Sequence, residues 1–407
     1  MTVAATEDAA FLPDGRYAWL RLAVSMAICT ISGVGMWSFV VALPAVQADF
    51  GVTRADASLP YTLTMLGFAA GTLVMGRVVD RFGIVVTLLI GAASIGLGYV
   101  GAGVSPTIVV FALAHLLVGL GSSCGFGPLV SDISHWFVKR RGIAVGICAS
   151  GNMLAGALWP LVIQHFIVSP GWRPTHIGIG IFCMLTTVPL AVLLRRGARH
   201  HRASAGGAPP EAASLRLSPA TLLALLSVAG VACCVAMAMP QVHIVAYCGD
   251  LGYGVARGAE MLSLMMGFGI VSRIGSGLIA DWIGGLRTLL LGSLLQGVAL
   301  ALYAAFNGLE SLYVISALFG LFQGGIVPSY AIIVREYFPA REAGTRLGVI
   351  LMCTLFGMAF GGWVSGYIFD LTGSYRAAFL NGLAWNLLNV GIVLWLLARP
   401  GRRPAMA

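Results

Sequence analysis

The sequence has little charge for its length. Only 10% of its 407 residues are Asp, Glu, Lys or Arg, whereas 58% are hydrophobic and the mean hydropathy is +0.92. A soluble protein carries about a quarter charged residues. Polar surface is therefore too scarce to cover soluble domains of this length, and the composition predicts a chain embedded in a membrane.

The sequence also lacks the motifs of metal sites and enzymes. Its eight cysteines fall inside apolar runs without paired metal-ligand spacing, which indicates small packing residues. It contains no zinc-protease helix motif, serine nucleophile elbow or phosphate-binding loop motif. We therefore expect no metal, no cofactor and no enzymatic activity.

Long apolar runs fill most of the chain. Spanning the hydrocarbon takes about 20 helical residues, and twelve windows of that kind can be placed, so the predicted fold is an all-α integral membrane protein. The windows cover residues 17–43, 57–77, 84–103, 107–128, 142–167, 174–195, 219–247, 257–280, 286–306, 311–333, 345–369 and 375–398.

The net charge of +9 is distributed by side rather than gathered in one patch. Most of the 24 basic residues, Arg21 among them, fall at one set of span ends, and the opposite loops hold Arg54, Arg173, Arg257 and Arg376. Such bias sets topology. We expect a multi-pass protein of the cell (inner) membrane with both termini cytoplasmic, with lipid rather than nucleic acid around it. Residues 1–16 lack the basic start of a signal peptide.

One linker divides the chain. Residues 196–218 are rich in Arg, Gly, Ala and Pro, which favours a mobile connection. The predicted domains are an N-terminal six-helix bundle over 1–195, a cytoplasmic linker over 196–218 and a C-terminal six-helix bundle over 219–407.

The two halves repeat one another at an offset of 201 residues. Asp49 and Gly51 match Asp250 and Gly252. Gly119 matches Gly320 at the same offset. Two parallel six-span repeats joined by a basic linker resemble the major facilitator superfamily, which implies a substrate site near the bilayer midplane between halves that rock around it.

A loop motif follows the same offset. Gly76, Asp80 and Arg81 lie between spans 2 and 3, and Gly277 and Asp281 lie between spans 8 and 9. Glycine permits a tight turn, and an Asp here can cap a helix or pair with an Arg. In the superfamily this motif is thought to latch one conformation, so we assign these residues to gating, with ordinary loop charges as the alternative.

Two segments are similar to the signatures of the monocarboxylate porter family. One precedes span 1 and the other leads into span 5, and their matching residues are Asp14, Gly15, Trp19, Phe137, Lys139, Arg140, Arg141 and Gly146. Arg16 and Tyr17 depart from the first signature. The oxalate–formate exchanger family shares the basic entry to span 5 and is a close competitor, and the basic run could also be a membrane anchor. The resemblance implies transport of a small carboxylate, by a protein that works as a monomer.

One basic residue is expected deep within a span. Arg273 lies eight residues before Asp281, about 12 Å along a helix, and its counterpart in the first half is Thr72. All acidic residues are expected at span ends or in loops. A buried guanidinium matches a carboxylate in geometry, so we interpret Arg273 as the substrate anchor, which the resemblance also puts in span 8. A snorkelling or solvated Arg is the alternative.

Other polar residues within spans are weaker candidates. His115 and His243 could carry a coupling proton, because histidine titrates near neutrality, and His115 could also bind substrate. The remaining candidates for substrate binding are Tyr61, Asn152, Gln323 and Tyr330. Packing is the alternative for each.

The coupling mechanism is open. In animal relatives an Asp one turn before the span 8 Arg serves proton coupling, whereas this sequence has Gly269 there. Proton-coupled uptake, carboxylate exchange, uptake of a larger aromatic or vitamin-like solute, and drug efflux therefore all remain as hypotheses. Span 5 lacks the glycine-rich run usual in multidrug exporters.

Overall fold

The computed structural model describes residues 14–138, 140–195 and 217–399. Their contacts divide the chain into two compact units, Met1–Val52 with Leu59–Arg202, and Thr53–Ser58 with Ala203–Ala407. The predicted boundary at 196–218 falls largely outside the described residues. The short segment Thr53–Ser58 groups with the second unit, which the sequence did not indicate.

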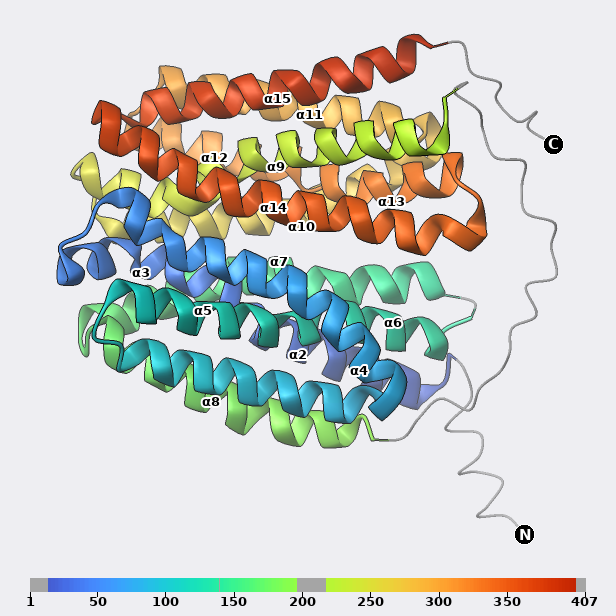
Figure 1. Cartoon of the computed structure of the whole chain (residues 1–407), viewed down its shortest axis with the longest axis horizontal. Helices are drawn as coiled ribbons and strands as arrows, with labels where there is room; N and C mark the ends of the chain where they lie inside the picture. The colour runs from blue at the N-terminus through green and yellow to red at the C-terminus, as the bar shows by residue number, and fades with distance from the viewer. Residues whose placement is uncertain (1–13, 139, 196–216, 400–407) are drawn as a thin grey trace. The chain divides into compact units, whose positions relative to one another are not determined.

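The first unit is built from helices (Figure 1). These are α2 (Arg16–Ser32), α3 (Val34–Phe50), α4 (Arg54–Gly103), α5 (Ile108–Ser122), the 3-10 turn Ser123–Gly125, α6 (Gly127–Trp136), α7 (Arg141–Val168) and α8 (Trp172–Leu193).

The second unit is also helical throughout its described part. It contains α9 (Pro219–Asp250), α10 (Val255–Ile283), α11 (Gly285–Ala305), α12 (Leu309–Gln323), α13 (Ile326–Tyr337), α14 (Ala340–Thr372) and α15 (Tyr375–Ala398).

The predicted number of spans is confirmed. Within the described residues, eleven helical stretches are long and apolar enough to cross a membrane. One of them, α4, has 50 residues, about twice the length that the hydrocarbon requires, and its backbone leaves the helical conformation at Gly83 (φ 80°, ψ 172°). It therefore supplies two spans, which makes twelve.

Three of the predicted spans are not continuous helices. The first breaks at Gly33 between α2 and α3, the fourth at the 3-10 turn after α5, and the tenth at Gly324 and Gly325 between α12 and α13. Hydropathy does not register these breaks, because glycine and small residues leave an apolar run intact.

Backbone geometry carries the repeat. Gly83 and Gly284, 201 residues apart, have φ of +80° and +83°, a region that favours glycine. Helix contacts repeat as well, because a Cβ on Gly119 would collide with the Thr64 carbonyl oxygen and one on Gly320 would collide with that of Met265. The same pair of helices in each unit thus approaches through a glycine, as expected where water does not drive helix association.

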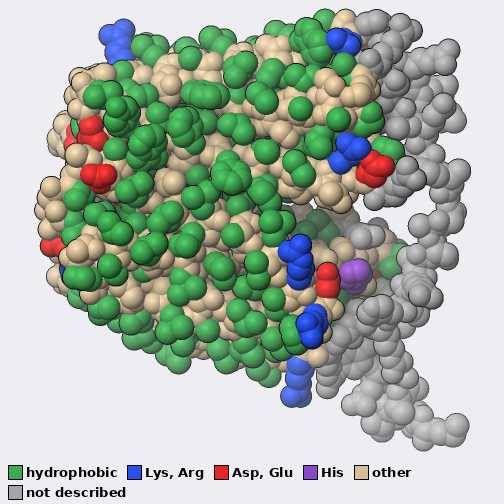
Figure 2. Space-filling model, viewed as in Figure 1, with side chains coloured by type: hydrophobic (Ala, Val, Ile, Leu, Met, Phe, Trp, Pro, Cys, Tyr) green, Lys and Arg blue, Asp and Glu red, His purple; other side chains and the backbone are tan. Residues whose placement is uncertain are grey.

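Apolar side chains cover the outward faces of the helices. Figure 2 shows hydrophobic side chains over most of the visible surface, with charged ones toward the helix ends. Leu97, Leu185, Ile274 and Leu387 are each more than half exposed. Exposed apolar surface of this extent is what a lipid environment accommodates.

The close contact at Gly320 gives a test of the packing. We expect Gly320→Val to destabilise the protein by about 1–3 kcal/mol, because the added side chain would overlap the Met265 backbone. Gly391→Val is the matched control, since a Cβ at Gly391 meets nothing within 4 Å. Thermal unfolding of the purified protein in detergent measures the difference, and equal midpoints for the two variants would contradict the close approach.

Candidate functional site

Arg273 lies in α10 with its side chain half-buried. Between Glu260 and Asp281 it is the single charged residue of the sequence. One turn later, Ser276 packs against Gly325, where a Cβ would meet the Ser276 side chain. Arg273 therefore lies one turn of α10 away from the break between α12 and α13.

The break places a helix N-terminus within the tenth span. Gly325 precedes α13, and Gly324 is so close to α10 that a Cβ there would collide with the Gly269 carbonyl oxygen. The first N–H groups of a helix carry partial positive charge. The start of α13 thus adds partial positive charge beside α10, one turn from Arg273.

Two further predicted residues of the second unit contact α9. Tyr330 is fully buried in α13, and its hydroxyl lies 3.5 Å from the Cys233 sulfur. Gln323 is buried at the end of α12, and its Oε1 accepts a hydrogen bond of 3.0 Å from Gln241 Nε2. Both side chains therefore join α9 to the broken span, and Gln241 is a partner that the sequence analysis missed.

Two candidates of the first unit lie on α7 and α4. Asn152 of α7 is half-buried next to Gly33, with its Oδ1 3.3 Å from where a Gly33 Cβ would lie. The same junction is held by Thr30, which donates to the Gly151 carbonyl at 3.3 Å and accepts through its own carbonyl from Trp159 Nε1 at 2.8 Å. Tyr61 is buried in α4.

His115 belongs to a buried pair of histidines. Its ring centroid is 5.7 Å from that of His176, and Phe111 and Tyr99 pack against both rings. Nδ1 of each histidine faces a backbone carbonyl, of Phe111 at 3.0 Å and of Trp172 at 2.8 Å. Each Nδ1 is then the donor, and within the described residues each Nε2 is a buried atom without a hydrogen-bond partner.

Arg21, which is expected at a span end, lies in the second turn of α2 and is buried there. Its side chain is fully buried and forms two hydrogen bonds with Asp132 of α6, Nε to Oδ2 at 2.7 Å and Nη2 to Oδ1 at 2.9 Å. Nη1 donates to the Leu194 carbonyl at 3.0 Å. Asp132 itself lies four residues before the end of the candidate span Ile108–Trp136.

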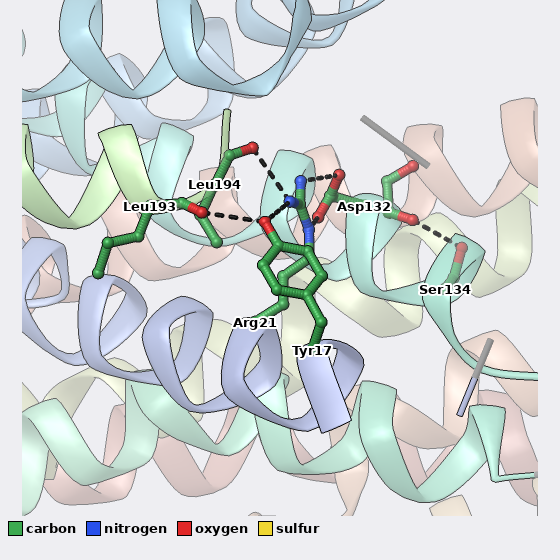
Figure 3. A network of polar contacts seen from close by, with 7 residues as sticks. Tyr17, Arg21, Asp132, Ser134, Leu193 and Leu194 are labelled. Carbon is green, nitrogen blue, oxygen red and sulfur yellow. Dashed lines mark hydrogen bonds and ion pairs between the residues drawn. The ribbon is translucent and has the colours of Figure 1, made fainter. Parts of the chain in front are cut away.

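Arg21 is the centre of a network that joins α2, α6 and the end of α8 (Figure 3). The Tyr17 hydroxyl donates to the Leu193 carbonyl at 3.0 Å, and the Arg21 guanidinium lies 4.8 Å from the centre of the Trp136 ring. The last carbonyls of α8 have no partner within their own helix, so these two side chains satisfy them.

The two family-like signatures contact one another. The backbone N–H of Asp14 donates to the Trp136 carbonyl at 3.0 Å, and Asp14 Oδ2 accepts from the Val138 N–H at 3.2 Å. The rings of Trp19 and Phe137 meet edge to face at 5.1 Å. Gly15 caps α2, Arg140 precedes α7 and Gly146 is exposed within α7, whereas Lys139 and the side chain of Arg141 lie outside what the structure describes.

The proposed gating residues lie at exposed helix ends. Asp80, Arg81 and Asp281 are exposed, Gly76 and Gly277 are half-buried, and the Arg81 guanidinium lies 5.2 Å from the Phe82 ring. In the second unit the N-terminus of α11 is capped by Glu336, whose Oε1 accepts from the Gly285 N–H at 2.9 Å. Among the described residues the cap is thus supplied by α13 rather than by Asp281.

Comparison with known proteins decides the family. A family model described as Major Facilitator Superfamily matches residues 26–311 and 283–406. The chain belongs to this superfamily.

Relatives within the superfamily cover nearly the whole chain. Monocarboxylate transporter 13 of Bos taurus is 26% identical over 94% of this chain and 90% of its own length. Monocarboxylate transporter 11 of Homo sapiens is 24% identical over 97% of this chain and 85% of its own. A bacterial homolog of the human lysosomal transporter Spinster, solved inward-facing and unoccupied, has a TM-score of 0.69 at 16% identity over 94% of this chain and 95% of its own.

The buried pair of Arg21 and Asp132 allows a stability test. We expect Arg21→Leu to lower the free energy of unfolding by about 3–5 kcal/mol, because it leaves a carboxylate without its partner. Replacing both residues by Leu should cost less than the single change, since no charge then remains buried. Thermal unfolding in detergent compares the three proteins, and a double variant less stable than Arg21→Leu would rule out mutual compensation.

Proposed function

We propose that the protein carries a small organic anion of the monocarboxylate type across the cell membrane by alternating access, with Arg273 binding the carboxylate. The observation that carries the proposal is the position of Arg273, about 15 Å from the end of α10 at 1.5 Å per residue. A charge at that depth is costly and usually functional. The names of the relatives, monocarboxylate transporters 13 and 11, support the substrate class.

The start of α13 complements the guanidinium. A carboxylate near Arg273 would receive a bidentate hydrogen bond from the planar fork and the favourable end of a helix dipole. Tyr330 and Gln323 hold α13 and α12 against α9, so we assign them to positioning this region. Tyr61, Asn152 and His115 remain proposed contacts from the first unit.

The same proposal includes orientation and coupling. Basic span ends favour cytoplasmic termini, and the exposed residues Asp80, Arg81 and Asp281 are proposed to latch one conformation. We further propose that uptake is coupled to a proton carried by a histidine, with His243 and His115 as the candidates. Exchange of carboxylates is the alternative, because Gly269 gives Arg273 no acidic partner one turn away. We expect the monomer to be the working unit.

Uptake of radiolabelled lactate, pyruvate, oxalate and benzoate into proteoliposomes tests the anion site. We expect Arg273→Ala to lower carboxylate uptake about 10- to 100-fold, the value of a charge-assisted hydrogen bond. Arg273→Lys should retain part of the uptake, since lysine keeps the positive charge but lacks the planar guanidinium that binds a carboxylate through two hydrogen bonds. Arg287→Ala is the matched control, because Arg287 is an exposed arginine of the same unit. Undiminished uptake in Arg273→Ala would exclude the anchor, and preference for a neutral solute would exclude carboxylate transport.

The driving force is tested with the same vesicles. We expect an acidic exterior to accelerate uptake and a protonophore to abolish the acceleration, because a symported proton then moves down its gradient. Acceleration by unlabelled carboxylate trapped inside, with no response to the pH gradient, would instead establish exchange.

A further inference from the structure

The first turn of α4 is held by the second unit. Asp370 of α14 accepts hydrogen bonds from the backbone N–H groups of Arg54 at 2.9 Å and Ala55 at 2.7 Å. These N–H groups have no partner within the helix, and a carboxylate at a helix N-terminus is also favoured by the dipole. A Cβ on Gly366 would lie 2.9 Å from the Arg54 carbonyl oxygen, so α14 approaches the turn closely through a glycine.

The Arg54 side chain is buried in the second unit, to which the first turn of α4 also belongs. Contrary to the expectation of an outer-loop residue, it is only 7% exposed. Nη1 lies 2.5 Å from the Tyr375 hydroxyl oxygen and 3.1 Å from Asp250 Oδ2, and the guanidinium lies 4.8 Å from the centre of the Phe369 ring. We name Arg54, Asp250, Asp370 and Tyr375 the α4 clamp.

His243 is hydrogen-bonded to the clamp. It is fully buried in α9, with Nε2 2.8 Å from the Gly362 carbonyl oxygen and Nδ1 3.2 Å from the Tyr375 hydroxyl. A carbonyl only accepts, so Nε2 carries the hydrogen and Nδ1 accepts from the tyrosine. The Tyr375 oxygen in turn accepts from Arg54. The donor chain therefore runs from the Arg54 guanidinium through the Tyr375 hydroxyl to neutral His243.

We propose that His243 is a proton-binding site that controls the α4 clamp. A proton on Nδ1 removes the acceptor of the Tyr375 hydroxyl and places a second cation beside Arg54. Both changes weaken the bond between Arg54 and Tyr375, so protonation favours release of the first turn of α4. The rest of α4 belongs to the first unit, and release of this turn frees one helix that is shared by both units.

Other charged and titratable groups around the clamp agree with this arrangement. Asp370 from α14 faces the turn, and Asp250 and Tyr247 lie on α9 itself, with the Tyr247 ring 5.2 Å from that of Tyr375. From α10, Glu260 is bound by Arg257 and by Tyr313. Arg54 is thus joined to His243 through the Tyr375 hydroxyl, and its charge opposes a second one there. The proposal rests on the proposed transport function only for its biological role. That role is to link proton binding to a change of conformation.

A distance measurement without substrate tests whether protonation of His243 releases the first turn of α4. Spin labels on Thr53→Cys and Asn307→Cys, both exposed and both in the second unit, report the position of the turn by electron paramagnetic resonance. We expect one distance at pH 7.5 and a second, longer one at pH 5.5. A single linked proton allows at most about a hundredfold change over two pH units, and we expect about tenfold in the ratio of the two populations. The protein without the added cysteines gives the background, which is needed because Cys353 is half-buried while the other seven cysteines are buried.

Variants separate His243 from other causes. His243→Gln can accept from Tyr375 and donate to Gly362 but cannot take the proton, so it should hold the single distance at both pH values. Arg54→Gln should show the second distance at both. Tyr375→Phe should move the transition to higher pH, because the neutral histidine loses its donor. His165→Gln, at an exposed histidine of the first unit, should respond like the parent protein.

Two results would overturn the proposal. One is an unchanged pH response in His243→Gln together with Tyr375→Phe, and the other is a parent protein with one distance at both pH values. Neither result bears on carboxylate binding at Arg273, which the uptake experiment measures, so failure of the switch and failure of the proposed function are distinguishable.

Discussion

Hydrocarbon offers no hydrogen bonds, so each polar group that this chain buries needs a partner inside the protein. Arg21 meets that requirement by donating hydrogen bonds to Asp132 and to a carbonyl at the end of α8. Asn386 and Asn389 of α15 answer it with the carbonyl and the hydroxyl of Ser293 on α11, at 2.9 and 2.7 Å. Buried polar pairs of this kind therefore tie particular helices together within each unit.

The backbone repeats between the two units, whereas the candidate site side chains do not, and these two observations have different causes. Matching glycines at 83 and 284 turn the chain in the same way in both units, because only glycine adopts that conformation without strain. The candidate site residues within the spans do not follow the offset. His115 corresponds to Ser316, which is bonded to Tyr303 at 2.7 Å, and Arg273 corresponds to Thr72. A symmetric scaffold thus carries asymmetric sites, as expected when function depends on a few side chains rather than on the fold.

The spans, the repeat and the resemblance to monocarboxylate transporters could be predicted because each is carried by hydropathy or by residues close together along the chain. Burial of Arg21 and Arg54 could not, since a hydropathy window averages over all faces of a helix and both residues lie within two turns of a helix end. The contact between the two signatures joins Asp14 to Val138, and the histidine pair joins His115 to His176. Contacts between residues so far apart in the sequence leave no local pattern in it. Whether the proposed site residues bind substrate stays a prediction.

Gly269 connects the packing of the second unit with its electrostatics. Its carbonyl is so close to Gly324 that the two helices meet backbone to backbone at the break between α12 and α13. That contact requires a glycine at 324, and Gly269 itself is buried in α10. The residue one turn before Arg273 is thus part of the helix packing and carries no acidic side chain. The positive charge is not neutralised from that position, which agrees with the proposed anionic ligand, and the proposed coupling proton would need another residue. A proton site at His243, beside the clamp on α4, would separate proton binding from anion binding within one unit.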